Sequence, residues 1–468
     1  MLMTQLKGVC DRLRGTPFLW AVLCGCLYTL GFAPFNLWPL ALLALWGVAS
    51  MAFQLQGFWR VVLFVFVFAF CHYLTALNWL IGSFLAMYDP LWLAWLLGVV
   101  CVVVLSAFLA AFMALFLAPA VRLLQGRGVL VQGLFFASFW VAFEAMRSFL
   151  VPTFAWNLPV HVWADSPEFL QALPHVGLFG LSFIFVLSAV WLRCPVGRVF
   201  SVLLLVGVYL NGLAVLSNAP DGLTEKDEKG LSVHVVSGYV PQKEKWQKQT
   251  KWSYLNDYLE RSSPPEEVDL LIWPETAVTY YVERDDALRD YLRQKTTAEA
   301  FVFGAPSYRL GGYYNSLYKM DADGQLSFRY DKRYLVPFGE YFPFQNWMPA
   351  FLQKFLQGQS SYSSGQADQQ GLMVKGVVFA PLICGEIVLP FAADLVDGDA
   401  DYVLNITNDA WFRGFWGPAQ HFAIVKVQAA LLQKTVLRVA HGGTSALIDA
   451  YGRVLWQLVD GEQGVLSL

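Results

Sequence analysis

The first half of the chain is a series of long apolar runs, broken only by short stretches of Gly, Pro and charged residues up to about Ser217. A membrane-spanning helix needs about 20 mainly apolar residues. Seven runs meet that requirement, at residues 17–34, 38–55, 60–82, 91–119, 129–149, 168–192 and 198–217. The pattern predicts an α-helical membrane bundle of seven spans in a domain covering residues 1–217.

The basic residues of the short loops fall on one side of these predicted spans. That side also holds the N-terminus, and its members are Lys7, Arg12, Arg14, Arg60, Arg122, Arg127, Arg193 and Arg198. Because cytoplasmic loops are enriched in Lys and Arg, we expect the N-terminus to be cytoplasmic. No small-x-small cleavage site follows the first run, so we expect it to be retained. Seven crossings then place everything after Ser217 outside the cytoplasm.

One predicted span carries two charges near its outward end. Glu144 and Arg147 are three residues apart, so they share one face of a helix. The simpler interpretation is a local ion pair that makes both charges tolerable. Because charged groups inside a membrane are expensive, a role at a lipid-facing site is the alternative.

Beyond residue 217 the pattern alternates β-branched strands with amphipathic helices. The predicted strands are 231–237, 268–273, 301–306, 315–321, 374–384, 401–406 and 444–449, and the predicted helices are 249–262, 288–298 and 419–434. Asp323-Gly324 predicts a hairpin turn, and residues 357–370, rich in Ser, Gly and Gln, predict a mobile loop. Mixing of this kind predicts one α/β domain, residues 218–468, with layered sheets between helices.

Composition agrees with a membrane protein and narrows the function. The 468 residues are 57% hydrophobic and only 14% charged, far from ordinary soluble composition. The net charge of −3 is nearly balanced, which gives no indication of a nucleic-acid partner. The six His residues are scattered, and no Cys/His cluster has metal-ligand spacing, so we expect no metal and no cofactor.

Cys384 is the one cysteine in the predicted exported domain; the other six lie in the membrane half, where packing explains them. An unpaired thiol is a liability in an oxidising compartment unless it has a function. Cys384 ends the apolar run 377–383 and precedes Gly385, so a strand leads into a sharp turn. That geometry exposes a nucleophile, although a structural thiol is an equally good interpretation of these residues alone.

A thiol nucleophile needs a base, and two further segments offer polar groups. Glu275 follows the predicted strand 268–273, and Pro274 ends the strand's hydrogen bonding there. The segment 331–340 supplies Lys332 and Glu340. Taken singly, Glu275 could be a helix cap or a solvated acid, and Lys332 could be an exposed loop residue.

Together these segments resemble a known family. Trp273-Pro274-Glu275, the run Lys332-Arg-Tyr-Leu-Val-Pro-Phe-Gly-Glu340 and Cys384-Gly-Glu386 occur in the order and rough spacing of the nitrilase superfamily. Combined with the multi-span N-terminal half, they resemble the apolipoprotein N-acyltransferase family. Supporting matches extend over nearly the whole chain: Glu144-x-x-Arg147-Ser148, 154–157, 177–183, Pro241-Gln242 with Trp246, 408–412 and 417–421.

The resemblance implies a fold and a mechanism. The soluble domain would be a four-layer αββα sandwich, with Glu275 as base, Lys332 as electrostatic stabiliser and Cys384 as nucleophile. The acyl donor would be a phospholipid, chiefly phosphatidylethanolamine, whose acyl group forms a thioester on the cysteine. The acceptor would be the N-terminal amine of the diacylglyceryl cysteine of an apolipoprotein. We therefore expect a multi-pass protein of a bacterial inner membrane with its catalytic domain in the periplasm.

The family pattern also assigns supporting residues and marks three departures. Glu340 and Glu386 match positions near the site, where we expect them to orient Lys332 and the nucleophile, and Trp246 matches a position at the substrate mouth. Gly385 stands where Tyr is common, which we expect to loosen or widen the acyl pocket. Residues 438–444 replace the usual Arg-x-Thr-Asn-x-Gly, and the chain ends at Leu468, before the family's eighth span, so we expect either a naturally short or a truncated form.

Two alternative functions remain at this stage. One is a membrane-anchored amidase or nitrile hydrolase of the nitrilase type, in which water attacks the thioester. The other is an inactive family member that binds lipoproteins without acylating them, suggested by the altered segment 438–444 and the missing final span. Retention of all three triad residues indicates that the chemistry persists, which argues against the inactive family member.

Overall fold

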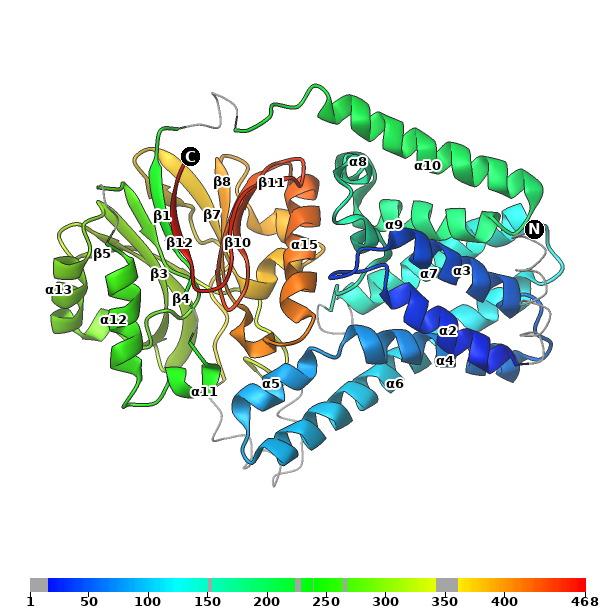
Figure 1. Ribbon diagram of the computed structural model, residues 1–468, viewed down its shortest axis with the longest axis horizontal. Helices are drawn as coiled ribbons and strands as arrows, with labels where there is room; N and C mark the ends of the chain where they lie inside the picture. The colour runs from blue at the N-terminus through cyan, green and yellow to red at the C-terminus, as the bar shows by residue number, and fades with distance from the viewer. Residues whose placement is uncertain (1–15, 150–153, 224–228, 239, 264–266, 342–360) are drawn as a thin grey trace. The chain divides into compact units, whose positions relative to one another are not determined.

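The computed structural model describes residues 16–149, 154–223, 229–238, 240–263, 267–341 and 361–468. By its contacts the chain forms two compact units (Figure 1). The first comprises the chain up to Ala219 together with Phe412–Leu431. The second comprises Pro220–Trp411 and Leu432–Leu468.

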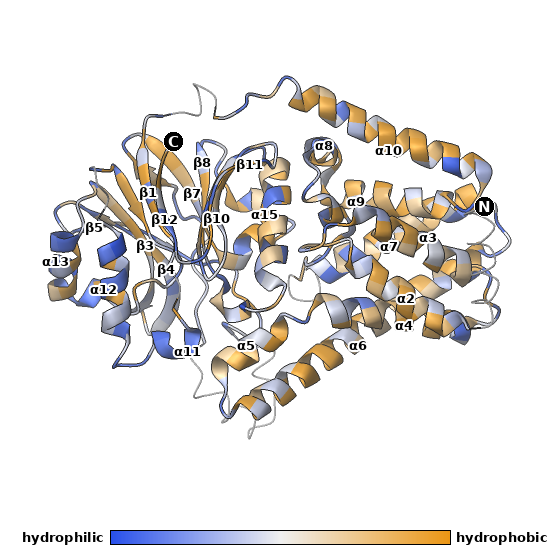
Figure 2. Ribbon diagram, in the orientation of Figure 1, coloured by the Kyte–Doolittle hydropathy of each residue, from blue (hydrophilic) through white to orange (hydrophobic). Residues whose placement is uncertain are grey.

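The first unit is helical. Its helices are α2 (Pro17–Thr29), α3 (Trp38–Ala52), α4 (Phe58–Ala76), α5 (Leu80–Met87), α6 (Leu91–Leu124), α7 (Val129–Phe149), η1 (Pro159–Trp163), α8 (Pro167–Leu170), α9 (Leu173–Trp191), α10 (Pro195–Leu216) and α15 (Gly417–Leu432). Figure 2 shows that hydrophobic residues dominate α2–α4, α6, α7, α9 and α10. Among the described residues, five helices are long and apolar enough to cross a membrane: α4, α6, α7, α9 and α10.

Five of the seven predicted spans correspond to these long helices, and the other two correspond to shorter apolar helices, so seven spans stay a prediction. Helix α2 has 13 residues and α3 has 15. The run 17–34 is shortened because the chain leaves the helix at Thr29 and passes through turns as far as Leu37, with Asn36 in the left-handed conformation. The next helix starts at Trp38, with Pro39 in its first turn, where proline is well tolerated.

The predicted ion pair in α7 is present. Arg147 Nη2 lies 2.5 Å from Glu144 Oε2, and both residues are buried. Trp140 donates to the other carboxylate oxygen at 3.2 Å, and Arg147 also donates to the carbonyl of Phe154 at 2.9 Å. The two charges are thus satisfied within the helical unit, as buried charges must be.

The second unit contains two six-stranded mixed sheets. The first has the order β12-β1-β2-β3-β4-β5, with β1 (Ser232–Val236), β2 (Leu270–Ile272), β3 (Ala300–Arg309), β4 (Gly312–Asp321), β5 (Leu326–Asp331) and β12 (Gln463–Ser467). The second has the order β11-β10-β9-β8-β7-β6, with β6 (Leu372–Val374), β7 (Val377–Ile383), β8 (Tyr402–Asn408), β9 (Thr435–His441), β10 (Ser445–Ile448) and β11 (Val454–Leu458).

Each sheet has a parallel centre, β1-β2-β3 in one and β7-β8-β9 in the other. Such strands are buried on both faces, which explains the continuous apolar sequences of β2 and β7. The Asp323-Gly324 turn joins β4 to β5 as predicted. The predicted strand 374–384 is in fact the end of β6, a turn and then β7, because Lys375 and Gly376 take left-handed conformations.

Two hydrophobic cores define the layers of this unit. One lies between the sheets, where Val235, Ile272 and Leu317 meet Phe379, Ile406 and Val439 among others. The other lies between the first sheet and helices α12 (Lys251–Arg261) and α13 (Asp286–Lys295). Figure 1 shows these helices on the outer face of that sheet. The remaining short helices are α11 (Gln242–Lys245), η2 (Val282–Arg284), η4 (Cys384–Val388), η5 (Ala392–Leu395) and η6 (Asp409–Phe412).

The predicted α/β sandwich is therefore present, with one helical layer and two sheets. Helix α15, which the sequence assigned to the C-terminal domain, groups by its contacts with the helical unit: Gln420 accepts from Trp156 Nε1 at 2.7 Å and donates to Ala76 O at 3.2 Å. The fourth layer stays a prediction. The predicted loop 357–370 lies partly outside the described residues, and its described part, 361–370, forms no helix or strand.

Candidate active site

The three residues proposed for catalysis each follow the end of a strand. Glu275 comes after β2 by way of Trp273 and Pro274, Lys332 directly follows β5, and Cys384 directly follows β7. The charges of Glu275 and Lys332 both act on the pKa of the Cys384 thiol. The three side chains therefore lie at one site, at strand ends contributed by both sheets.

Cys384 sits on a sharp turn between β7 and η4. Its φ of +53° lies in the left-handed region, which costs a non-glycine residue on the order of 1 kcal/mol. Burial and then the negative charge of Glu275 raise the pKa of the thiol to about 12, opposed by Lys332 and by a hydrogen bond to Thr407. The resting thiol is therefore neutral, and it needs a base to become a nucleophile.

Lys332 is buried beside two acidic residues, Glu340 and Glu275. Its Nζ lies 2.8 Å from Glu340 Oε2. Burial alone would lower the pKa of the ammonium, but Glu340, Cys384 and Glu275 together raise it above the ordinary value, so Lys332 stays charged. The amide of Asn315, on β4, donates to Glu340 Oε1 at 2.9 Å and to Glu275 Oε1 at 2.7 Å, which ties the two acids together.

Glu275 has the properties of a general base. Burial raises the pKa of its carboxyl group; Lys332 acts against burial, and Glu340 adds to it. Oε1 is held by Asn315, while Oε2 is buried and has no hydrogen-bond partner in the described part of the chain. An acid with a raised pKa and an unused oxygen is suited to accepting a proton.

A glycine on β3 makes room for the backbone of Glu275. A Cβ added at Gly304 would lie 2.7 Å from Glu275 Cα and 2.4 Å from Thr276 N. Both are backbone atoms, which cannot move aside as the end of a side chain can. Close approach of the two segments therefore requires glycine at this position.

Glu386 joins the segments that carry Lys332 and Cys384. Its buried carboxylate accepts from the backbone N–H groups of Arg333 at 2.7 Å, Tyr334 at 3.1 Å and Ile383 at 2.7 Å. The hydroxyl of Tyr330 donates to it as well. These contacts fit the orienting role expected for Glu386.

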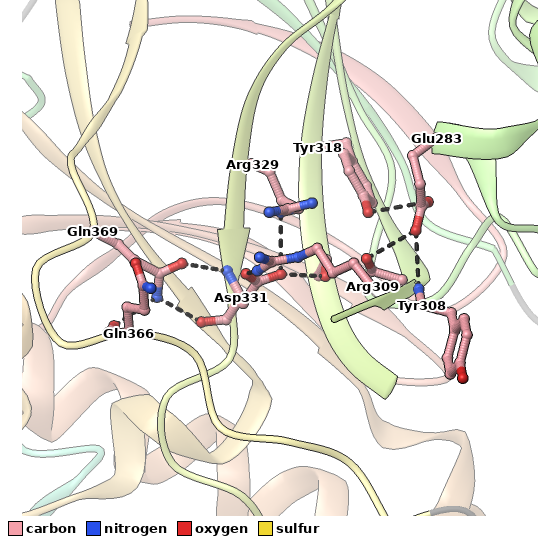
Figure 3. Close-up of polar contacts among 10 residues, drawn as sticks. Glu283, Tyr308, Arg309, Tyr318, Arg329, Asp331, Gln366 and Gln369 are labelled. Carbon is pink, nitrogen blue, oxygen red and sulfur yellow. Dashed lines mark hydrogen bonds and ion pairs between the residues drawn. The ribbon is translucent and has the colours of Figure 1, made fainter. Parts of the chain in front are cut away.

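The residue before Lys332 is fixed by a polar cluster (Figure 3). The buried carboxylate of Asp331 forms ion pairs with Arg309 and Arg329 and accepts from Ser316 Oγ at 2.7 Å. The Gln369 side chain bonds both the N–H and the carbonyl of Asp331, each at 2.7 Å. The backbone at Lys332 is thereby held from its N-terminal side.

The unusual segment 438–444 supports the turn at Cys384 indirectly. Arg438 on β9 donates to Asn405 Oδ1 at 3.0 Å and pairs with Asp409 at 2.5 Å. The amide of Asn405 in turn donates to the carbonyl of Cys384 at 3.3 Å. Gly443 permits this packing, since a Cβ there would lie 2.6 Å from Asp409 Oδ2.

Trp246 and Gly385, the other two residues expected to support the site, have few contacts. Trp246, at the end of α11, is 45% exposed, and its indole makes no hydrogen bond to the residues described. Among the described residues, a Cβ at Gly385 would meet only Val336, at 3.8 Å, and the effect of the missing Tyr on the acyl pocket stays a prediction. Within the described ranges, no group of three His, Cys, Asp or Glu side chains could hold a metal ion.

Sequence reasoning missed Asn315, Asp331 and Lys245. Asn315 lies within β4, where no motif marks it. Asp331 ends β5 and opens the segment 331–340, in which the sequence pointed only to Lys332 and Glu340. Lys245 stands in a charged stretch, Lys243-Glu244-Lys245, which is typical of a solvated turn, yet it is only 2% exposed. These residues become visible only once the fold brings the strands together.

Comparison with known proteins identifies both halves of the chain. Residues 24–191 match the model of the apolipoprotein N-acyltransferase N-terminal domain, and residues 237–468 match that of the carbon-nitrogen hydrolases. The apolipoprotein N-acyltransferase of Pseudomonas paraeruginosa is 30% identical over 474 residues, and that of Azotobacter vinelandii is 32% identical over 480. Each match covers 96% of this chain and 88% of the relative.

Among solved structures, an amidase from a Nesterenkonia species is 18% identical, with a TM-score of 0.37, over 53% of this chain and 94% of the amidase. The full-length relatives carry more weight, because their matches extend through both the helical unit and the α/β unit. This chain belongs to the apolipoprotein N-acyltransferase family.

Proposed function

We propose that this protein transfers a fatty acyl chain from a phospholipid to the N-terminal amine of the lipidated cysteine of an apolipoprotein, through a thioester on Cys384. Family membership supports the reaction class. The observation that carries the proposal is the meeting of a neutral thiol, a buried acid with a raised pKa and a charged amine at one site.

In the first half-reaction Glu275 takes the thiol proton as the sulfur attacks the ester carbonyl of the phospholipid. Lys332 and the backbone N–H of Gly385 stabilise the negative charge that develops on the carbonyl oxygen. The C–O bond of the ester then breaks, and Glu275 returns its proton to the leaving lysophospholipid oxygen. The products are the Cys384 thioester and a lysophospholipid.

The second half-reaction reverses these roles. The α-amine of the apolipoprotein attacks the thioester carbonyl, and Glu275 accepts a proton from the nitrogen. The C–S bond breaks, and the proton passes to the Cys384 sulfur. An amide is formed and the enzyme is restored, so that one acid serves both steps in a ping-pong reaction.

Phosphatidylethanolamine is the donor we propose, as the resemblance to the family implies, and the diacylglyceryl form of the apolipoprotein is the acceptor. Both substrates are anchored in lipid. A catalytic domain, residues 218–468, attached to a membrane domain, residues 1–217, would therefore meet both substrates without extracting them into water.

Contacts within the helical unit support seven spans rather than five. Helices α2 and α3 are joined by residues 30–37, and Asn36 donates to Asp165 while Phe35 stacks edge-on with Trp416 at 5.1 Å. Asp165 lies between α7 and α9, so this loop is at the same end of the bundle as those helix termini. At the opposite end, Leu55 accepts from Gln125, which follows α6. Helix α3 thus extends between the two ends of the bundle. Trp20, near the start of α2, donates to the carbonyl of Gly47 in the second half of α3, which supports an antiparallel course for α2.

Charge supports a periplasmic catalytic domain. Arg60, Arg122, Arg127, Arg193 and Arg198 all lie at the end of the bundle where α4, α7 and α10 begin; Lys7, Arg12 and Arg14 lie outside the described residues. The number of membrane spans is odd in both cases: seven if α2 and α3 cross the membrane, and five if neither does. In either case residues after α10 emerge on the side opposite the N-terminus.

The test uses the full chain in vesicles that contain phosphatidylethanolamine with a labelled acyl group. A diacylglyceryl lipopeptide with a free N-terminus is the acceptor, and the same peptide with a blocked N-terminus is its control. We expect a hydroxylamine-sensitive label on Cys384, followed by transfer to the free amine alone. The variant Cys384→Ser should form no hydroxylamine-sensitive thioester.

Two results would contradict the proposal. Release of free fatty acid without transfer to the lipopeptide would indicate a hydrolase of the nitrilase type. Absence of any acyl label on Cys384, in protein that still binds the lipopeptide, would indicate a lipoprotein-binding protein without catalytic activity.

A further inference from the structure

Lys245 is a buried cation that the proposed reaction does not use. It ends α11, is 2% exposed, and its Nζ has no hydrogen-bond partner among the described residues. Burying an ammonium group without a partner costs several kcal/mol. The nearby Trp246 and Lys248 are exposed, so the turn buries this one lysine while its neighbours face solvent.

The position of Lys245 is fixed by the ends of the central strands. Its backbone N–H donates to the carbonyl of Pro241 at 3.1 Å. The neighbouring Gln242 accepts from the Asn408 amide, at the end of β8, at 3.1 Å. Val240 lies within hydrogen-bonding distance of His441, at the end of β9. Because β7, β8 and β9 are parallel neighbours, Lys245 is held at the same edge of the second sheet as Cys384, which follows β7.

A buried oxygen of opposite charge lies in the same site. Glu275 Oε2, like Lys245 Nζ, is buried and has no hydrogen-bond partner among the described residues. The charges of Lys245 and Glu275 act on one another. The ammonium group of Lys245 and the carboxylate of Glu275 have opposite charge. Within the described residues, neither Lys245 Nζ nor Glu275 Oε2 forms a hydrogen bond.

Lys245 is one of two cations that act on Glu275. The groups that act on Glu275 are Lys332, Glu340, Asn315 and Lys245; Glu275 acts on Lys245, and Lys245 in turn lowers the pKa of His441. Lys332 is paired with Glu340 at 2.8 Å. The buried Glu386 accepts hydrogen bonds from backbone N–H groups. Glu275 has no ion-pair partner of its own among the described residues, and Lys245 is the second cation that acts on it.

We infer that Lys245 is a positioning residue of the proposed acyl transfer, whose ammonium faces the unbonded oxygen of Glu275 and keeps that carboxylate ionised until it takes the proton of Cys384. This inference rests on the proposed function. Once Glu275 is protonated, the same positive charge favours return of the proton to the leaving oxygen, because it restores the carboxylate.

The inference has a defined pH dependence. A cation beside a carboxylate lowers the pKa of the carboxyl group by about one unit or more. Loss of Lys245 should therefore move the acid limb of the acylation rate to higher pH. Burial lowers the pKa of Lys245 itself to about 7, against the opposing effect of Glu275. The difference between wild type and variant should consequently be largest below pH 7 and fade above it.

The experiment measures the initial rate of Cys384 thioester formation between pH 5 and 9 in vesicles of labelled phosphatidylethanolamine. For Lys245→Met we expect the acid limb to move up by about one pH unit, with a roughly tenfold lower rate at pH 6. Lys245→Arg keeps the charge and should leave the acid limb at or below its wild-type position. Lys248→Met, a change at an exposed lysine of the same turn, should have the wild-type profile.

A lower rate for Lys245→Met with an unchanged acid limb would overturn the inference, since a merely structural lysine would change the amplitude alone. If Lys245→Met does not fold, an upward shift of the acid limb in Lys245→Arg would overturn it equally. If the wild type forms no thioester at any pH, the proposed function itself fails.

Discussion

At the scale of single residues, the site keeps its nucleophile neutral until substrate arrives. Burial and Glu275 hold the pKa of Cys384 near 12, so very little thiolate exists in the resting protein. Glu275 alone would not ionise a thiol with so high a pKa. Proton transfer from Cys384 to Glu275 is therefore coupled to the attack of the sulfur on the ester. A neutral resting thiol is also protected against oxidation, which proceeds through the thiolate.

This predicts slow alkylation of Cys384 at neutral pH. An ordinary thiol has a pKa of 9.0, and the raised value of about 12 lowers the thiolate fraction at pH 8 by about a thousandfold. The rate with iodoacetamide, followed by mass spectrometry of the Cys384 peptide, should rise about tenfold per pH unit past pH 9. The unfolded chain, as control, should level off near pH 9, and an early plateau in the folded protein would contradict the raised pKa.

Glu275→Gln should remove the proton acceptor while keeping the shape and the hydrogen-bonding capacity of the side chain. We expect thioester formation to fall by about 10²- to 10⁴-fold, while the melting temperature changes little. The control is Glu299→Gln, a change at an exposed acid, which should have wild-type activity. A fall of less than tenfold in Glu275→Gln would indicate that another group accepts the proton.

The sequence predicted the residues that end strands and missed those within them. Glu275 and Cys384 stand where an apolar run stops, and a polar group at such a point is visible in the pattern. Lys332 follows the mixed run 326–331, and only the resemblance to the family pointed to it. Asn315 lies inside β4, and its link between Glu275 and Glu340 depends on the pairing of β4 with β3 and β5. Such a contact exists only after the sheet has formed.

At the scale of elements, the site depends on how closely β3 approaches the end of β2. Gly304→Ala should force the two segments apart, because its Cβ would lie 2.4 Å from a backbone nitrogen. We expect a loss of stability of about 1–3 kcal/mol, and at least tenfold slower thioester formation because Glu275 is displaced. Both are measured on the purified protein, by thermal unfolding and by the acylation assay.

Gly398→Ala is the matched control for this change. Its Cβ would meet no atom within 4 Å, and its φ is not positive. This variant should keep wild-type stability and activity. Equal effects of the two substitutions would show that loss of a glycine, rather than the close approach at Gly304, causes the defect.

Strands made of apolar residues were easier to predict than strands that bury charged groups. Strand β2 is an apolar run that lies within its predicted range, 268–273. Strand β8, which also buries Asn405, was predicted at 401–406 and extends over 402–408. Strand β9 was missed because Arg438 and His441 interrupt its pattern, although both are fully buried. The partners that make this possible for Arg438, Asn405 and Asp409, come from distant sequence.

At the scale of the whole molecule, the length of two helices leaves the number of spans as the main open prediction. Helices of 13 and 15 residues measure about 20 Å, against a hydrocarbon core of about 30 Å. Apolar length alone therefore favours five spans. The contacts of Asn36 with Asp165 and of Leu55 with Gln125, at opposite ends of the bundle, favour seven.

Cysteine labelling separates the two topologies. In a background without native cysteines, Leu37→Cys introduces a thiol at a half-exposed position between α2 and α3. If α2 and α3 span the membrane, an impermeant maleimide added to spheroplasts should label this thiol. It should also label Gly398→Cys in the catalytic unit, whereas Gly126→Cys, between α6 and α7, should react only after permeabilisation.

Protection of Leu37→Cys in intact spheroplasts would favour five spans and leave the catalytic domain periplasmic, because the number of spans stays odd. Protection of Gly398→Cys would place that domain in the cytoplasm, and the proposed access to exported apolipoproteins would then be wrong.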